Sequence, residues 1–345
     1  MKMNAVVLEK HQHLVYKQVP IPALKPGEVR IAVKYCGVCG TDLHIVYDGS
    51  LRYPHIPGHE ITGVVVEAAD EEGDGLIGKE VTAYGIIGCG HCIHCQNKDY
   101  SKCQSYTFVG AARDGGFAEY VNYPARNVIP LAGLSLRSGA LIEPTAVTVH
   151  AIRLLREIPK SSVVIGTGPI GLLAAQALRA MGTQDTVVVG FSDRKAELVR
   201  SLGFGFVNCT KESVAERLAA RGYADGVPAV LECSGQVTGL NCALNAASPG
   251  GEVVMVGIFE SDVLLDAKAC HGILRKELRV FGSWISSHSA GQNDSDWCVA
   301  MDLIRCGKID TEQMITSEIE LQDVPAALEQ LHSARGADIK TLIHV

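Results

Sequence analysis

Residues 166–171 read Gly-Thr-Gly-Pro-Ile-Gly and fit the pattern G-x-G-x-x-G. The apolar run Ser162–Ile165 precedes them and an apolar helical pattern follows, which is the strand-to-helix context that this pattern requires. Gly166 permits a tight turn, Gly168 lets the backbone approach a pyrophosphate, and Gly171 lets helix and strand pack closely. Because the helix N-terminus adds free N–H groups, the turn predicts a dinucleotide site. Its candidate residues are Gly166, Gly168, Pro169, Ile170 and Gly171.

Strands and helices alternate around this turn. The predicted strands are Val163–Ile165, Thr186–Val189, Val230–Cys233 and Val253–Val256, and the predicted helices are Ala146–Arg156, Ile170–Met181 and Lys195–Leu202. Alternation over this length predicts an α/β fold with a doubly wound parallel sheet. We expect this nucleotide-binding domain to span residues 149–283.

The N-terminal part of the chain is β-rich instead. Its predicted strands are Met1–Val7, Val29–Lys34, Thr62–Glu67 and Phe117–Tyr123, separated by turn signals such as Pro-Gly and Asp-Gly. A helix over Asp296–Cys306 and short mixed elements close the chain and indicate a return to this first domain. We therefore expect the first domain to combine residues 1–148 and 284–345. The polar loop Ser286–Asp296 is either a surface insertion or the edge of a pocket.

Composition excludes several classes of protein. The 345 residues carry a net charge of −7 and no basic tract, which argues against a nucleic-acid partner. No apolar run reaches the ~18 residues that a membrane span needs. Twelve cysteines without a secretory segment favour the reducing cytoplasm. A hydrophobic content of 47% with 6% aromatic residues suits an α/β protein with close helix–sheet packing.

Four cysteines with the spacing C-x2-C-x2-C-x7-C form the first candidate metal site. Cys89, Cys92, Cys95 and Cys103 lie in a segment of glycines and polar residues, and such a loop lets four sulfurs turn toward one tetrahedral zinc. Four closed thiolate ligands are typical of a structural site, which stabilises a lobe of about residues 84–106. Free thiols and a disulfide pair are the alternatives, and the nearby histidines 91 and 94 are competing ligands.

A second group of ligand-type residues lies closer to the N-terminus. Cys39 is followed by Thr41 and His44, and His59 stands next to Glu60. A catalytic zinc needs few protein ligands and one open position for substrate. The nearby Cys36 ends a predicted strand, and we interpret it as a core residue.

These motifs together resemble the zinc-dependent medium-chain dehydrogenases/reductases over essentially the whole chain. The resemblance rests on residues 37–42, on Gly58-His59-Glu60, on the four cysteines, on residues 113–120 and 142–144, and on the glycine pattern. It is strongest to the polyol branch, which contains sorbitol, threonine and galactitol-1-phosphate 5-dehydrogenases. It implies a GroES-like, β-rich catalytic domain beside a Rossmann domain, with two zinc ions per chain.

The resemblance also implies roles for single residues. Cys39 and His59 would bind the catalytic zinc, and Glu60 would be a direct or a switching ligand. Glu143 would be a further candidate ligand of this zinc, because it would sit where polyol enzymes carry a carboxylate. Thr41 would relay a proton from the substrate hydroxyl, because zinc lowers the pKa of that hydroxyl. His44 would pass the proton to solvent, or it is a surface or ribose-contacting histidine.

The implied reaction is hydride transfer between a secondary hydroxyl of a polyol or polyol phosphate and NAD(P)+. A sugar acid, threonine or a simple secondary alcohol remains an alternative substrate, and a zinc-stabilised nucleotide-binding protein is the non-enzymatic alternative. Candidate substrate contacts are Tyr47, Arg113, Glu143 and Trp284, and candidate phosphate partners are Arg113, Arg275 and Lys276.

The end of the strand Thr186–Val189 bears on the choice between NAD and NADP. An acidic residue at this place would bind the ribose 2′-hydroxyl and repel a 2′-phosphate, but the sequence has Gly190. Ser192 and Arg194 are candidate contacts of a 2′-phosphate, whereas Asp193 could take over the acidic role. The sequence thus slightly favours NADP, and the cofactor set is completed by Ser234 and Gly257.

Relatives of this kind pair through edge strands of the nucleotide domain. The corresponding segments here are Gly257–Leu265 and Leu278–Gly282. We expect a homodimer or a homotetramer.

Overall fold

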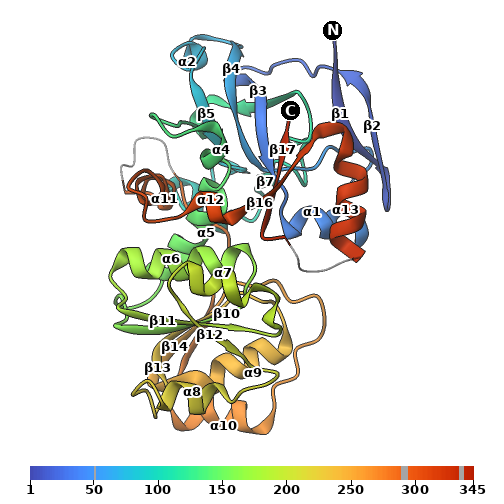
Figure 1. Cartoon of the computed structure of the whole chain (residues 1–345). Helices are drawn as coiled ribbons and strands as arrows, with labels where there is room; N and C mark the ends of the chain where they lie inside the picture. Colours follow the sequence, from blue (N-terminus) through green and yellow to red (C-terminus); the bar gives the residue numbers. More distant parts are fainter. Residues whose placement is uncertain (50–51, 289–293, 334–337) are drawn as a thin grey trace. The chain divides into compact units, whose positions relative to one another are not determined.

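The computed structural model describes residues 1–49, 52–288, 294–333 and 338–345, and its chain divides into two compact units (Figure 1). Unit 1 comprises Met1–Glu143, Ser287–Ile304 and Met314–Val345, and unit 2 comprises Pro144–Ser286 and Arg305–Gln313. The divisions near residues 143 and 287 lie close to the boundaries expected from the sequence. Residues 305–313, however, group with unit 2 although we expected them in the first domain.

Unit 2 contains a parallel sheet of six strands in the order β12-β11-β10-β13-β14-β15. Its strands are β10 (Ser161–Ile165), β11 (Asp185–Gly190), β12 (Gly205–Asn208), β13 (Val227–Glu232), β14 (Ala247–Met255) and β15 (Arg279–Gly282). The sequence order reverses between β10 and β13, which is the switch point of a doubly wound sheet. Buried valines, isoleucines and leucines along the central strands explain why both faces of the sheet are covered.

Helices cover both faces of this sheet, α6 and α7 on one and α8, α9 and α10 on the other (Figure 1). Their bounds are α6 (Pro169–Met181), α7 (Ala196–Ser201), α8 (Val214–Ala219), α9 (Val237–Ala246) and α10 (Ala267–Arg275). Helix α5 (Ile142–Arg153) begins and ends earlier than the predicted Ala146–Arg156. The predicted strand Val230–Cys233 is wrong at its end, because Glu232 closes β13 and Cys233 already belongs to the following loop.

Unit 1 is built on a mixed seven-stranded sheet. The strand order is β16-β17-β3-β4-β5-β9, with β8 pairing β3 beside this path. The strands are β3 (Glu28–Gly37), β4 (Glu60–Ala68), β5 (Glu80–Ala83), β8 (Tyr120–Pro124), β9 (Val128–Pro130), β16 (Ile315–Glu320) and β17 (Lys340–His344). The C-terminal strand β17 pairs antiparallel with β3, so the end of the chain joins a sheet that begins with residues 28–37. Residues 314–345 group with unit 1.

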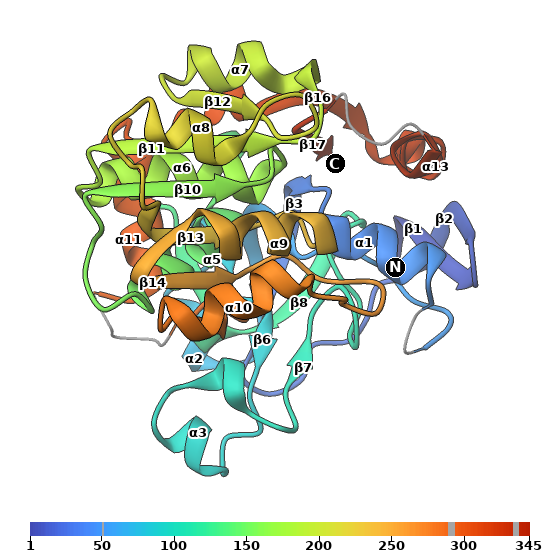
Figure 2. The ribbon, with the colours of Figure 1, turned by 90° about the horizontal axis from the view of Figure 1, so that it is seen from below.

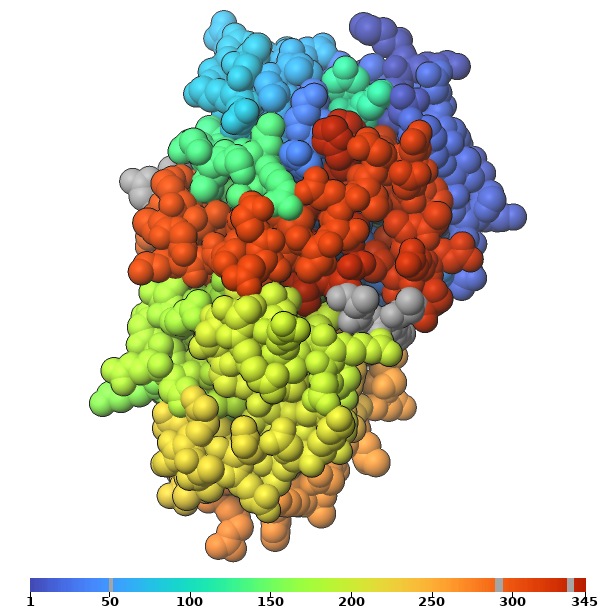
Figure 3. All heavy atoms as spheres, viewed as in Figure 1, coloured from blue at the N-terminus to red at the C-terminus, as the bar shows by residue number. Residues whose placement is uncertain are grey.

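Smaller elements complete unit 1. Two separate antiparallel pairs are formed by β1 (Lys2–Lys10) with β2 (His13–Pro20) and by β6 (Ile86–Ile87) with β7 (Thr107–Phe108). The helices are α1 (Gly40–Tyr47), α2 (Glu71–Asp74), α3 (Ile93–Gln96), α4 (Leu136–Gly139), α11 (Asp296–Arg305) and α13 (Val324–Ser333). Helix α12 (Thr311–Met314) belongs to unit 2 except for its last residue. In the space-filling view, the C-terminal residues (red) lie against the N-terminal strands (blue) (Figure 3).

The two segments predicted as edge strands of unit 2 differ in the structure. Residues 256–266 form no strand, so the predicted edge strand Gly257–Leu265 is wrong: the chain leaves the sheet where β14 ends at Met255. The second segment, Leu278–Gly282, contains the edge strand β15, and its pairing with a second copy stays a prediction. Most of the loop Ser286–Asp296, residues 289–293, lies outside the described residues. Among the described helices, none is long and apolar enough to cross a membrane.

Candidate active site

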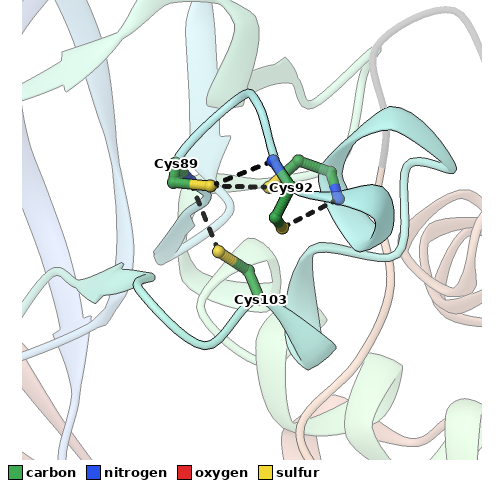
Figure 4. A group of neighbouring side chains, drawn as sticks. Cys89, Cys92 and Cys103 are labelled. Carbon is green, nitrogen blue, oxygen red and sulfur yellow. Dashed lines mark hydrogen bonds between the residues drawn. The ribbon is translucent and has the colours of Figure 1, made fainter.

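The four predicted cysteines lie together in a single loop, which we call the cysteine lobe (Cys89, Cys92, Cys95 and Cys103). One ligand atom from each lies within 4.8 Å of the others. Figure 4 shows three of these side chains turned toward one another, and Figure 2 shows the segment around α3 extending away from β6 and β7. Backbone N–H groups support the sulfurs: those of Cys92 and Cys95 donate to the sulfurs three residues earlier, each across 3.4 Å.

The chemistry of the cysteine lobe suits a thiophilic cation. Hydrogen bonds from the backbone of His91 and Cys92 lower the pKa of the Cys89 thiol to about 6. Burial raises the pKa of Cys95 to about 12. A metal binds thiolates, so it would replace the proton that Cys95 otherwise holds. All four cysteines are unpaired by disulfides. The residues present therefore fit a tetrahedral zinc ion.

A second set of ligand atoms lies deeper in unit 1. Single ligand atoms of Cys39, His59 and Glu60, here called the Cys39 cluster, lie within 4.8 Å of one another. Cys39 precedes α1, whereas His59 and Glu60 stand at the start of β4. His59 and Glu60 are buried. One thiol, one imidazole and one carboxylate make three protein ligands and leave a fourth position open. Catalytic zinc sites use open sets of this kind.

Asp42 lies beside the Cys39 cluster and contacts the segments that carry Cys39 and His59. Its two carboxylate oxygens accept hydrogen bonds from the backbone N–H of Cys39 (2.9 Å) and of Gly58 (3.1 Å). The same carboxylate lies 3.7 Å from Nδ1 of His59, an atom that has no hydrogen-bond partner in the described structure. Carboxylates commonly fix the orientation of a metal-binding histidine in this way. Although burial opposes its charge, Cys39 and Asp42 raise the pKa of His59 to about 10, so a cation binding there would displace a proton.

The sequence analysis missed Lys340, which is buried beside the Cys39 cluster. Its ammonium group donates to both carboxylate oxygens of Glu60, at 2.7 and 2.6 Å, and to the carbonyl oxygen of Val38 at 3.0 Å. Gly37 leaves room for this carboxylate, because a Cβ there would lie 2.0 Å from Glu60 Oε2. The sequence offers little signal for this contact, because Lys340 is the first residue of β17 and its partner lies 280 residues away.

The remaining predicted residues occupy different surroundings. Glu143 is buried in the first turn of α5, and burial raises its pKa to about 7 against the effect of His59. Thr41 Oγ1 lies 3.6 Å from Cys39 Sγ. His44 is partly exposed and pairs with Asp48 across 2.9 Å. Cys36 is fully buried, as expected for a core residue.

The candidate cofactor residues of unit 2 gather at the carboxyl edge of its sheet. Gly166 has a positive φ of 115°, and a Cβ there would lie 3.2 Å from the backbone of Ser234. A Cβ on Gly171 would lie 2.0 Å from the carbonyl oxygen of Gly166. Gly168 instead faces open space at the N-terminus of α6, where Pro169 takes the first helical position. The turn therefore offers both free N–H groups and room for a pyrophosphate.

The edge at β11 has no room for an acidic side chain. Gly190 ends β11, and a Cβ there would lie 2.9 Å from the ring of Phe206 and 3.0 Å from Thr167. Asp193 is exposed and accepts hydrogen bonds from Asn208 Nδ2 (2.8 Å) and Lys211 Nζ (2.5 Å). These partners lower its pKa. Ser192 and Arg194 are exposed beside it.

Family models match both units of the chain. Residues 25–133 match the alcohol dehydrogenase GroES-like domain, and residues 169–304 match the zinc-binding dehydrogenase domain. Galactitol 1-phosphate 5-dehydrogenase of Escherichia coli (strain K12) is 31% identical over 97% of both chains. The chain belongs to the zinc-dependent medium-chain dehydrogenase family. This dehydrogenase is thus an NAD(P)-dependent zinc oxidoreductase of the alcohol/polyol type, and its predicted family, fold class and reaction class are confirmed.

Two further similarities show how far this dehydrogenase resembles others. L-Galactonate-5-dehydrogenase of Escherichia coli (strain K12) is 30% identical over 91% of each chain. A structure described as a zinc-binding dehydrogenase from Sinorhizobium meliloti 1021, bound to NADP, superimposes with a TM-score of 0.89 and 30% identity over the whole of both chains. The first acts on a sugar acid and the second holds NADP, so family membership leaves the substrate and the preferred cofactor of this dehydrogenase open.

Several predicted substrate contacts are engaged elsewhere. Arg113 pairs with the Glu28 carboxylate at 2.6 Å. Lys276 donates to the carbonyl oxygens of Asn245 and Ala247 at 3.0 and 2.6 Å. Tyr47 stacks on His332, with ring centroids 3.9 Å apart. Arg275 and Trp284 are exposed on unit 2. Arg113 and Tyr47 are thus held by other side chains of unit 1.

Proposed function

We propose that this dehydrogenase oxidises a secondary hydroxyl of a polyol or polyol phosphate, at a zinc ion bound by Cys39 and His59. The observation that carries the proposal is the convergence of the Cys39, His59 and Glu60 ligand atoms within 4.8 Å of one another. Zinc bound there would supply a Lewis acid that lowers the pKa of the substrate hydroxyl. A second zinc in the cysteine lobe is structural in this proposal.

The residues around the Cys39 cluster would hold and move the proton. Thr41 Oγ1, next to Cys39 Sγ, is the group proposed to accept the hydroxyl proton. His44 lies one helical turn further along α1, partly exposed and paired with Asp48, and would pass that proton to water. Glu143 lies in the same buried environment, and burial raises its pKa to about 7, so a cation bound beside it would replace the proton that it otherwise holds.

Lys340 would decide how Glu60 behaves. With both oxygens of Glu60 bound by the ammonium group, that carboxylate is held by protein rather than free to ligate. We therefore favour Glu60 as a switching ligand, with Cys39 and His59 as constant ones. The carboxylate of Glu143 would complete the set, either directly or through water.

NADP is the cofactor that we favour. Gly190 cannot be replaced by an acidic residue without displacing Phe206, and Asp193 is already neutralised by Lys211. Ser192 and Arg194 would then face a 2′-phosphate. If so, kcat/KM with NADP+ exceeds that with NAD+, and Arg194→Ala lowers only the NADP+ value, whereas Arg217→Ala on α8 changes neither. A large preference of the wild type for NAD+ would overturn this part of the proposal.

The substrate class is tested by initial rates. Purified protein with zinc bound would be offered galactitol 1-phosphate, sorbitol, xylitol, L-galactonate, threonine and 2,3-butanediol with each cofactor. Turnover on a polyol or its phosphate that a chelator abolishes and zinc restores supports the proposal. Turnover confined to L-galactonate or threonine would replace the substrate class.

Self-association through β15 is the form of assembly that we favour. In the described structure this edge strand pairs only with β14, and its residues are partly buried at most. An open strand edge is ready to pair with the same edge of a second copy. Light scattering would then give a multimer for the wild type and a smaller species for Val280→Pro.

A further inference from the structure

Glu232 is a fully buried carboxylate that the proposed reaction does not use. It ends β13, and none of its surface is exposed. No lysine, arginine or histidine of the described ranges forms an ion pair with it. Burying a charge without a counter-ion costs folding free energy, so this carboxylate needs hydrogen-bond donors. A carboxylate kept there at that cost suggests a functional role.

The donors come from the loop that follows β13. Glu232 Oε1 accepts hydrogen bonds from the backbone N–H of Ser234 (2.8 Å) and from the Ser234 hydroxyl. Oε2 accepts one from the N–H of Gly235 at 3.2 Å. Since both oxygens act as acceptors, the group serves as a carboxylate, although burial raises its pKa and Ser234 opposes that rise.

The same residue also fixes the loop after β14. Its backbone carbonyl accepts hydrogen bonds from Val256 N (2.8 Å) and Gly257 N (2.9 Å). A Cβ on Gly257 would lie 2.2 Å from Gly235 N and 2.9 Å from Glu232 Oε2. A Cβ on Gly235 would lie 2.2 Å from the carbonyl oxygen of Ile258. The two loops therefore meet over this carboxylate with no space for side chains between them.

These loops lie at the switch point of the sheet. Cys233 N donates to the carbonyl oxygen of Ile165 at 2.8 Å, which places the loop after β13 directly beside the turn at Gly166. In a doubly wound fold a dinucleotide crosses this point, with one mononucleotide over β10 and β11 and the other over the strands on the opposite side. The turn at Gly166 and the end of β11 would bind the pyrophosphate and the adenosine half of the dinucleotide. The β13 and β14 loops therefore face the nicotinamide half.

We infer that Glu232 is a positioning residue for the nicotinamide half of the cofactor. Its carboxylate holds the loop 233–236, its backbone carbonyl holds residues 256 and 257, and these two loops form the surface on which the nicotinamide ribose rests. The inference rests on the cofactor use of the family and concerns this chain's own loops. It assigns Ser234 and Gly257 a shared role, since both are fixed by the same residue, Ser234 by its carboxylate and Gly257 by its backbone carbonyl.

The test compares whole and half cofactors. Binding of NADPH and NADH would be measured by fluorescence, and binding of ADP, which lacks the nicotinamide ribose, by calorimetry. Glu232→Gln puts an amide NH2 against a donor, so we expect about tenfold weaker binding of the preferred dinucleotide and less than about twofold change for ADP. Ser234→Ala should also lower the ratio of dinucleotide affinity to ADP affinity, but by a smaller factor.

Glu252→Gln is the matched control. Glu252 is another buried carboxylate of unit 2, on β14, and it pairs with Arg279 and accepts a hydrogen bond from Arg156 N at 3.0 Å. Its loss should lower the melting temperature without changing the ratio of dinucleotide to ADP affinity. Equal weakening of ADP and dinucleotide in Glu232→Gln, or no weakening of either, would overturn the inference. Intact dinucleotide binding without any turnover would instead overturn the proposed reaction and leave the inference standing.

Discussion

The four sulfurs of the cysteine lobe come from one loop, residues 89–103, whereas the side chains around Cys39 come from α1, β4, α5 and β17. In the lobe, sulfurs are supported by N–H groups of the same loop. In the Cys39 cluster, the support comes from a carboxylate on α1 and an ammonium group at the far end of the chain. A local site of this kind can form once its loop closes around the metal, but a long-range site requires the completed sheet.

The difference implies different consequences of losing a ligand. A closed site of four thiolates contributes to folding, and an open site with mixed ligands contributes to chemistry. The following variants separate the two contributions, beginning with the largest expected effect.

Cys39→Ser should reduce turnover by about a thousandfold or more, because the Lewis acid is lost with its thiolate ligand. The fold should persist, since Cys39 stands at a helix start and holds no packing contact comparable to a core residue. Steady-state rates and circular dichroism would measure the two effects. Retained activity in this variant would refute the assignment of the site.

Lys340→Met should lower the free energy of unfolding by about 3–5 kcal/mol, because it leaves the buried Glu60 charge unpaired. The double variant with Glu60→Gln should recover part of that loss. Denaturant titration measures both. Arg137→Met is the control: Arg137 pairs with Glu318 on the surface, and its loss should cost about 0–1 kcal/mol. Equal losses in the two single variants would contradict the special role of Lys340.

Cys103→Ser should lower the melting temperature by about 5 °C or more, because it opens the closed site of the lobe. The rate constant per correctly folded molecule should change little. Thermal unfolding followed with and without a chelator would show it. If the chelator lowers the melting temperature of the variant as much as that of the wild type, the lobe holds no structural metal.

Asp42→Asn should have the smallest effect of the series, a reduction of metal affinity at the Cys39 cluster by about 10–100-fold. The amide still accepts one hydrogen bond, but it no longer offers a charge to His59 Nδ1. Competition with a chromogenic chelator measures the affinity. An unchanged affinity would show that the backbone alone orients His59.

The comparison of the two regions also explains what the sequence could and could not reveal. The cysteine lobe and the glycine turn are local patterns, so spacing alone predicted which residues come together. The contact of Lys340 with Glu60 and the packing of residues 256–258 over Glu232 join segments that are distant in the sequence. No local spacing pattern predicts such contacts. The strand predicted at Gly257–Leu265 failed for the same reason, because a strand needs a neighbour that sequence periodicity does not supply.

The central claim is that two independent zinc sites do separate work in this dehydrogenase. It is tested most directly by measuring zinc per chain, together with turnover, in the wild type, Cys39→Ser and Cys103→Ser. We predict two zinc ions in the wild type and one in each variant, with turnover lost only in Cys39→Ser. Full zinc content in Cys39→Ser, or loss of turnover with full stability in Cys103→Ser, would contradict the account.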